Sequence, residues 1–256
     1  TSVIILGGLK RISNAASKMV PSMVILYFVL VLFILMSNYE VVPKYFVMIF
    51  TDAFAAENFK GEPFFGGVLG ALILLGIRRG AFSNEAGIGT APMAHGAAKT
   101  DEPVREGLVA MLGPAIDTLV VCTLTALAIL VTGVWETTSD NGVSLTASAF
   151  NHAMPGYGAY LLMICVLIFS VSSLFSYAYY GSKCLSFLIG ADKKHYYNYI
   201  YIISIILAVT TPFSMMLNLI DGVFALMAIP TMISTIIMAP RVVKEIKGYI
   251  ERIKED

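Results

Sequence analysis

Long apolar runs, separated by short polar connections, recur along this chain. The clearest cover residues 20–36, 107–134, 157–188, 198–211 and 213–239. A helix needs about 20 predominantly apolar residues to cross a hydrocarbon core of about 30 Å. The composition agrees, because 57% of the residues are hydrophobic and only 13% are charged. The pattern therefore predicts an all-α, polytopic membrane protein in a lipid bilayer.

The polar connections are expected to be loops and short surface helices. Residues 9–19 are typical of an amphipathic linker, and residues 42–55 of an interfacial helix. Residues 136–156 are expected to form a polar loop, and residues 191–197 a tight basic turn. Pro21 would fall in the first turn of the first complete span, where proline is tolerated.

Lysine and arginine are unevenly distributed between the two sets of alternate connections. One set holds twelve of them and the other holds two. Because basic connections stay on the inner side of a membrane, we predict that the rich set and the C-terminus are cytoplasmic. The rich set comprises residues 9–19, 98–106, 191–197 and the amphipathic tail from Arg241, and the poor set comprises residues 39–64 and 135–156.

One stretch, residues 80–92, lies at membrane depth but is unsuited to a continuous helix. Its glycines weaken a helix, its proline removes a backbone donor, and Asn84 and Glu85 are costly in hydrocarbon. Irregular backbone at that depth must be buried in protein or line a cavity, and in secondary transporters it carries substrate and ion sites. We expect half-helices at 65–79 and 93–98. The alternative is a re-entrant loop without a ligand.

Within the spans, a few polar side chains are candidate functional groups. Asp117 is the only acid in its span, and it serves either a cation site or proton relay, or as a structural acceptor for a neighbouring helix. Ser172 and Ser173 lie mid-span, where hydroxyl oxygens suit a small hard cation. Serines also let helices pack closely, so a structural role for this pair stays open.

Nothing else in the sequence indicates a metal centre or nucleic-acid binding. The three cysteines lie in or at the end of apolar runs, without metal-ligand spacing, so we expect buried, inert thiols. The three histidines also lack such spacing and are expected to be solvated or to cap helices. The formal net charge of zero argues against a nucleic-acid partner.

Four segments carry a resemblance to a known family. Residues 79–95 read RGAFSNEAGIGTAPMAH and residues 116–125 read IDTLVVCTLT. Residues 177–181 read YAYYG and residues 226–230 read LMAIP. Together they resemble the alanine or glycine:cation symporter family, of which the first segment is the most characteristic. The resemblance covers essentially the whole chain.

This resemblance implies a leucine-transporter-type fold built from two inverted five-helix repeats, in a single transmembrane domain. About six spans of that core would be present, from the end of the fourth helix through the tenth. Residues 1–64 would hold the end of the first repeat and the connecting loop, residues 65–240 the second repeat, and residues 241–256 a cytoplasmic tail. Residues 1–8 then resemble the cut end of a helix, so we expect the sequence to be a fragment.

The interruption and the resemblance together indicate a substrate pocket. Phe82, Ser83, Asn84 and Gly87 would line it, with free carbonyls facing the ammonium group of an amino acid. Tyr177, where the family usually has Trp, would form the opposite wall. This difference leaves the choice of substrate open.

The resemblance also implies a cation site and a gate. Two adjacent hydroxyl residues hold sodium in the family, at the place of Ser172 and Ser173 here, with Asp117 as a weaker candidate. Asp221 would pair with Arg79, or with its neighbour Arg78, as an outer gate. The alternative for Asp221 is an ordinary first-turn acid favoured by the helix dipole.

The sequence therefore predicts a multi-pass symporter in the plasma (inner) membrane of a prokaryote, not an enzyme. It would take up L-alanine or glycine with sodium, or with protons, without an organic cofactor or another metal. An intramembrane aspartyl protease using Asp117 and Asp221 is one alternative, but acids at different depths are poorly placed to share a proton. A channel is the other, although a continuous pore needs no interrupted helix.

Overall fold

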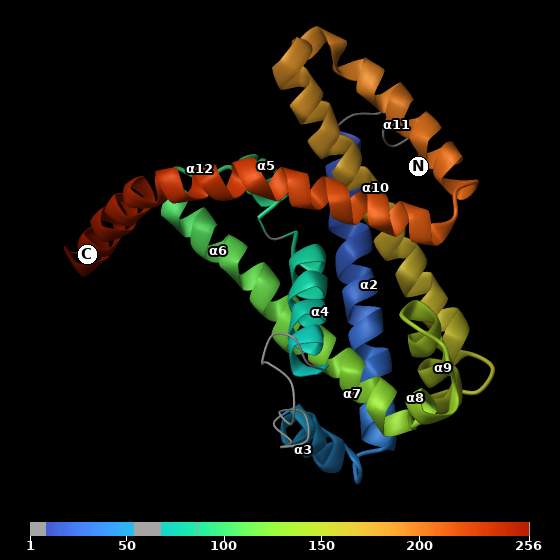
Figure 1. Ribbon diagram of the computed structural model, residues 1–256. Helices are drawn as coiled ribbons and strands as arrows, with labels where there is room; N and C mark the ends of the chain where they lie inside the picture. Colours follow the sequence, from blue (N-terminus) through green and yellow to red (C-terminus); the bar gives the residue numbers. More distant parts are fainter. Residues whose placement is uncertain (1–8, 54–67, 86, 256) are drawn as a thin grey trace. The chain divides into compact units, whose positions relative to one another are not determined.

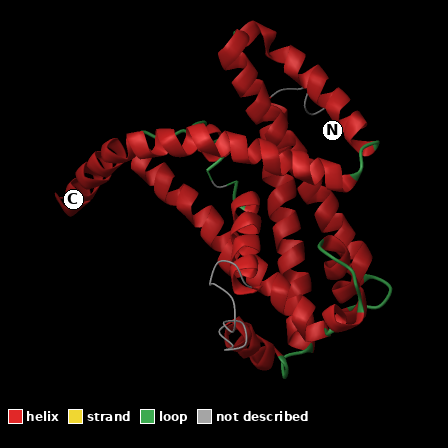
Figure 2. Ribbon diagram, in the orientation of Figure 1, coloured by secondary structure: helices red, strands yellow, loops and turns green. Residues whose placement is uncertain are grey.

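The computed structural model describes residues 9–53, 68–85 and 87–255. In that part of the chain all regular secondary structure is helical, without strands (Figure 1, Figure 2). Four described stretches are long and apolar enough to cross a bilayer: Ala16–Ser37, Pro103–Thr132, Gly158–Ile189 and Ser214–Lys254. The all-helical prediction is confirmed, whereas the inverted-repeat arrangement and the repeat boundaries stay predictions.

The helices group into two compact units. The first comprises residues 1–75 and 116–179, and the second comprises residues 76–115 and 180–256. Two helices, α4 (Val68–Ser83) and α10 (Gly158–Ile189), contribute residues to both units.

An apolar core holds the first unit together. Tyr27 of α2 stacks on Phe150 of α9 with ring centroids 6.0 Å apart. The Tyr27 hydroxyl also lies 2.5 Å from Thr125 Oγ1 on α7, and the Thr125 hydroxyl in turn donates to the Val121 carbonyl at 2.8 Å. The helices are α2 (Leu9–Ser37), α3 (Val42–Ala53), the start of α4, the π-helix η2 (Ile116–Cys122), α7 (Thr123–Thr132), α8 (Val134–Thr137), α9 (Val143–Ala153) and most of α10. Their buried core residues are Leu30, Val31, Ile34, Ala128, Val131, Phe150, Leu162 and Cys165.

The second unit surrounds the interrupted stretch. Here α6 packs against both α5 and α12. Pro103 opens α6, in the helical position where its missing N–H costs least. The elements are the end of α4, α5 (Thr90–His95), α6 (Pro103–Ala115), the end of α10, the 3₁₀ turn η3 (Ala191–Lys193), α11 (Lys194–Val209) and α12 (Phe213–Glu255).

Between α6 and α7 the helix widens into a π-helical stretch, η2 (Ile116–Cys122), which contains Asp117. Pro114 precedes it and has no N–H to donate, which weakens the regular i→i−4 ladder at this point. π-helical turns are rare and occur frequently at functional sites. The predicted span 107–134 is therefore one helical stretch, and its middle, which contains Asp117, is π-helical.

Three predicted connections are wholly or partly helical instead. The expected turn 191–197 is the 3₁₀ turn η3 followed by the start of α11 at Lys194. The expected linker 9–19 is the beginning of α2, so the placement of Pro21 in a first turn was wrong. A proline inside a helix removes one backbone hydrogen bond, and this 29-residue helix continues through the loss. The expected loop 136–156 contains α8 and α9, because Phe150 and Ala149 give α9 an apolar face that packs into the core.

The interruption is shorter than predicted. α4 continues past Gly80 to Ser83, since one glycine weakens a helix by only about 1 kcal/mol. α5 already begins at Thr90 and includes Pro92 in its first turn. The tail from Arg241 is the end of α12. Residues 1–8 and the predicted start of the first half-helix at 65 lie outside the described residues.

Candidate functional site

The interruption in the second unit is a turn with three residues in left-handed backbone conformations. α4 ends at Ser83 and α5 begins at Thr90. Between them Glu85, Gly87 and Gly89 have φ angles of 51°, 77° and 86°. Glycine adopts this region without a steric penalty, whereas Glu85 carries a side chain there and is strained. Such strain clusters at binding sites and switch regions.

A pocket of about 500 Å³ surrounds this turn, within the size range of small-molecule sites. Its wall includes Asn84 and Gly87 from the turn, and the hydroxyl residues Thr231 and Thr235 from α12. The turn approaches α12 closely, because a Cβ on Gly89 would lie 3.2 Å from Thr231 Oγ1. The wall also includes Glu85, so amide, carboxylate and hydroxyl residues surround the pocket.

Polar groups of the turn also stabilise the helix ends beside it. The backbone N–H and the side-chain amide of Asn84 both donate to the Gly80 carbonyl at 3.0 Å, which caps the end of α4. On the other side, Thr90 is buried, and its Oγ1 makes no hydrogen bond among the residues that the structure describes. A buried hydroxyl without a partner is unusual in a folded protein.

Only some of the predicted substrate residues line the pocket around the turn. Asn84 and Gly87 line the pocket. Ser83 is the exposed last residue of α4, and the side chain of Phe82 lies outside the described residues. Tyr177 belongs to the first unit, so its place opposite the turn stays a prediction.

In the first unit, two of the predicted cation residues line one cavity of about 380 Å³. Asp117 reaches it from the π-helical stretch and Ser172 reaches it from α10, while most of the wall is apolar. Ser172 is buried, and its hydroxyl donates to the Phe169 carbonyl at 2.8 Å, which leaves the oxygen lone pairs for a cation. Ser173 is half-buried on the same helix. The sequence did not predict that Asp117 and Ser172 line the same cavity, and the structure shows it.

Of the two arginines expected near Asp221, the structure pairs Arg78 with it. The Arg78 guanidinium donates to the Asp221 carboxylate, joining α4 to α12 within the second unit. Arg79, the next residue of α4, is exposed. A gate formed by Arg79 and Asp221 stays a prediction, whereas the ion pair itself belongs to Arg78.

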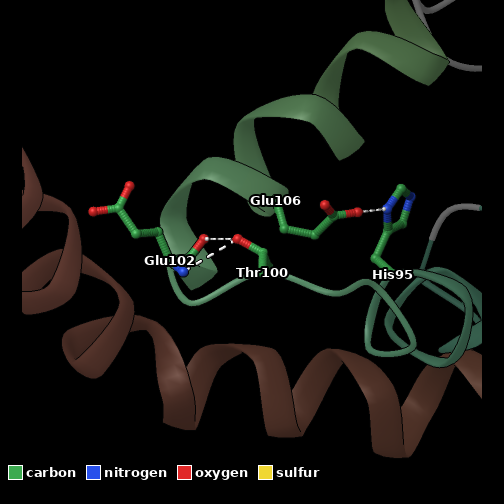
Figure 3. A network of polar contacts seen from close by, with 4 residues as sticks. All are labelled: His95, Thr100, Glu102 and Glu106. Atoms are coloured by element: carbon green, nitrogen blue, oxygen red, sulfur yellow. Dashed lines mark hydrogen bonds and ion pairs between the residues drawn. The ribbon is translucent and has the colours of Figure 1, made fainter.

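A second polar contact ties α5 to α6 (Figure 3). His95 Nδ1 lies 2.7 Å from Glu106 Oε1, and both side chains are partly buried. Nearby, the Glu102 N–H donates to Thr100 Oγ1 at 3.1 Å at the start of α6. His95 was expected to be solvated or to cap a helix. The contact with Glu106 was not predicted, because a partner eleven positions away leaves no local signal in the sequence. In the described chain, no group of three His, Cys, Asp or Glu residues is placed to hold a metal ion.

One further residue of the pocket wall, Thr231, is not among the candidates taken from the sequence. In the structure Thr231 lies in the pocket wall beside Gly89, and its hydroxyl donates to the Met227 carbonyl at 2.8 Å. Thr231 is far from the turn in sequence. Only the packing of α12 against the turn brings it beside Gly89.

The whole chain, residues 1–256, matches the sequence model of the sodium:alanine symporter family. It belongs to that family. The sodium/alanine symporter AgcS of Methanococcus maripaludis is 37% identical over all of this chain and 56% of its own length. The probable sodium/glutamine symporter GlnT of Bacillus subtilis is 32% identical over 98% of this chain and 52% of its own length. The chain spans about half the length of the curated relatives it matches.

Family membership agrees with several predictions made from the sequence. The sodium:alanine symporter family is a family of transporters, so the prediction that this chain is not an enzyme is confirmed. The long apolar helices and the family together make it an integral membrane protein. The aspartyl protease alternative is further weakened because Asp221 is engaged by Arg78.

The geometry of the turn predicts the effect of a small substitution, Gly89→Ala. The new Cβ would meet Thr231 Oγ1 at 3.2 Å and would hold alanine at a φ of 86°, a combination expected to cost about 1–3 kcal/mol. We expect a lower melting temperature in detergent and weaker alanine binding in the intact protein. Gly107→Ala in α6, where no atom lies within 4 Å, is the control. Equal behaviour of the two variants would show that the turn tolerates a side chain.

Proposed function

We propose that this chain forms part of a secondary active symporter that takes up a small neutral amino acid, alanine or glycine, together with sodium by alternating access. The transporter lies in the plasma (inner) membrane of a prokaryote with its C-terminus in the cytoplasm. The observation that carries the proposal is the polar, glycine-rich turn between α4 and α5, which interrupts a helix and opens onto a pocket in a member of this family. Interrupted helices hold the substrate and coupling ions in secondary transporters.

The substrate pocket is proposed to be the cavity around residues 84–89. Phe82, Ser83, Asn84 and Gly87 would contribute backbone carbonyls and small side chains, and Tyr177 would limit the size of the amino acid. One relative is named as a sodium/alanine symporter and another as a probable sodium/glutamine symporter. Neutral amino acids are the proposed class, with alanine and glycine as the expected substrates.

The coupling ion is proposed to bind near Ser172 and Ser173, with Asp117 as an additional ligand. Support comes from the shared cavity of Asp117 and Ser172 and from the π-helical stretch that presents the acid. Oxygen ligands suit sodium, and the carboxylate would balance its charge in an apolar wall. Protons are the alternative coupling ion.

The first test is uptake of radiolabelled alanine by the intact protein in proteoliposomes. Alanine is expected to accumulate against its gradient when sodium is higher outside, and to lose that accumulation when choline replaces sodium. A proton gradient imposed without sodium separates proton coupling from sodium coupling. If alanine entry is saturable but does not depend on the sodium gradient or the proton gradient, symport is excluded and a channel or uniporter is favoured.

The cation site predicts a shift in sodium dependence for Ser172→Ala and Ser173→Ala. A hydrogen bond or ligand contact to a charged group contributes about 1.5–3 kcal/mol, so loss of one hydroxyl should raise half-saturating sodium about tenfold or more. High sodium should then restore alanine affinity through coupling. Ser170→Ala is the control, because Ser170 is exposed on the same helix and donates to the Val166 carbonyl at 2.8 Å. If all three variants keep the parent's sodium dependence, the serines only pack helices and Asp117 becomes the next candidate.

The proposed wall residue predicts a change in substrate range for Tyr177→Ala. Removal of the ring should let larger amino acids such as leucine compete with labelled alanine, with an inhibition constant at least tenfold lower than in the parent. Tyr160→Ala, which removes an exposed ring from the same helix, should leave the profile unchanged. A Tyr177→Ala profile identical to that of Tyr160→Ala would assign Tyr177 to packing alone.

A further inference from the structure

The final part of α12, residues 241–255, differs in character from the rest of that helix. We call it the terminal segment. It contains five lysines or arginines and three glutamates, so it cannot lie in hydrocarbon. With a rotation of about 100° per residue, its apolar side chains fall within an arc of roughly 120°. These are Val242, Val243, Ile246, Tyr249, Ile250 and Ile253.

This apolar arc is uncovered within the second unit. Val243 is 51% exposed, Ile250 46% and Ile253 56%. On the opposite, polar side of the segment, Arg252 Nη2 lies 3.9 Å from Glu102 Oε1, just before α6, and both side chains are exposed. The polar side therefore lies toward α6, and the apolar side is directed away from this contact.

The length of α12 determines where the terminal segment must lie. The helix has 43 residues, which corresponds to about 64 Å, twice the hydrocarbon thickness of about 30 Å. Pro240 lies inside the helix immediately before the segment, and Figure 1 shows α12 curving toward its C-terminal end. Proline is the commonest cause of such a bend. The apolar part from Phe213 therefore fills the membrane, and the terminal segment begins at the membrane surface.

We propose that the terminal segment binds the surface of the bilayer that α12 crosses, with its apolar arc between the lipid chains and its lysines on anionic phospholipid headgroups. Lys247 and Lys254 lie next to one edge of the arc, within roughly 40° of Val243 by the same rotation. Their aliphatic stems extend along the apolar surface while the ammonium groups reach phosphate. A helix with an apolar face and lysines at its border is the type that lies in the interface plane.

The membrane surface is a better candidate than a protein for covering the apolar arc, because the terminal segment continues directly from a membrane-spanning helix. The segment follows a membrane span without a loop, so its apolar arc is already at the lipid surface, whereas a protein partner would have to be recruited there. This inference concerns anchoring and does not rest on the proposed transport function, so failure of either leaves the other standing.

Nitroxide spin labels on single-cysteine variants of the intact protein test the proposal in vesicles containing phosphatidylglycerol. A label at Ile250 should be accessible to oxygen and shielded from a water-soluble nickel chelate, and a label at the adjacent Glu251 should show the reverse. Across residues 242–253, the oxygen accessibility should repeat every 3.6 residues. Access of nickel to both labels would place the segment in water, and shielding of residue 250 from both reagents would indicate a protein partner; either result overturns the proposal.

The charge contribution is tested by replacing the two border lysines. K247E/K254E should reduce the depth of the label at Ile250 in phosphatidylglycerol vesicles and have a smaller effect in pure phosphatidylcholine. Lys244→Glu is the matched control, because Lys244 lies near the middle of the polar side and should change the depth less. Equal effects of these changes in both kinds of vesicle would exclude specific binding of anionic headgroups.

Discussion

The need to satisfy every backbone hydrogen-bonding group in a membrane governs this structure. Hydrocarbon offers no water to an N–H or a carbonyl, so all regular secondary structure in the described residues is helical. A helix can be interrupted only where protein or a cavity replaces the lost bonds. The turn between α4 and α5 meets this requirement, since Asn84 caps α4 through Gly80 and α12 packs closely against Gly89.

The contacts around the turn explain how a short, strained element can be held in place. α5 has only six residues and would not be stable alone. The contact between His95 and Glu106 ties it to α6, and the ion pair between Arg78 and Asp221 ties the end of α4 to α12. The pocket walls are thus fixed by side chains from four helices, which is what a preorganised binding site needs.

The first unit shows a second departure from regular helix geometry. The π-helical stretch after Pro114 widens the helix where Asp117 meets the cavity that also contains Ser172. In both units, then, polar side chains lie at the points where the α-helical ladder is locally broken. An interrupted or rewound helix exposes backbone groups that a ligand can use, which links these irregularities to the proposed sites for the amino acid and the ion.

Local composition was enough to predict several features. The run 157–188 became α10 at Gly158–Ile189, and Pro212 separates α11 from α12 as expected, because apolar length and proline act on the chain where they occur. The location of the interruption was also evident, although its first residue was not, since a single glycine does not end a helix whose neighbours favour it. Family membership followed from short motifs that are themselves local.

Other features depended on packing between distant segments. α9 forms within an expected loop because Phe150 finds Tyr27 of α2, and His95 finds Glu106 on another helix. The choice of Arg78 over Arg79 for Asp221 depends on the rotation of α4 against α12, about 100° per residue, which no local pattern records. The sequence by itself therefore determined which segments are helical spans and where the helix breaks. Only the tertiary structure decided which polar groups meet there, because those contacts are set by helix packing.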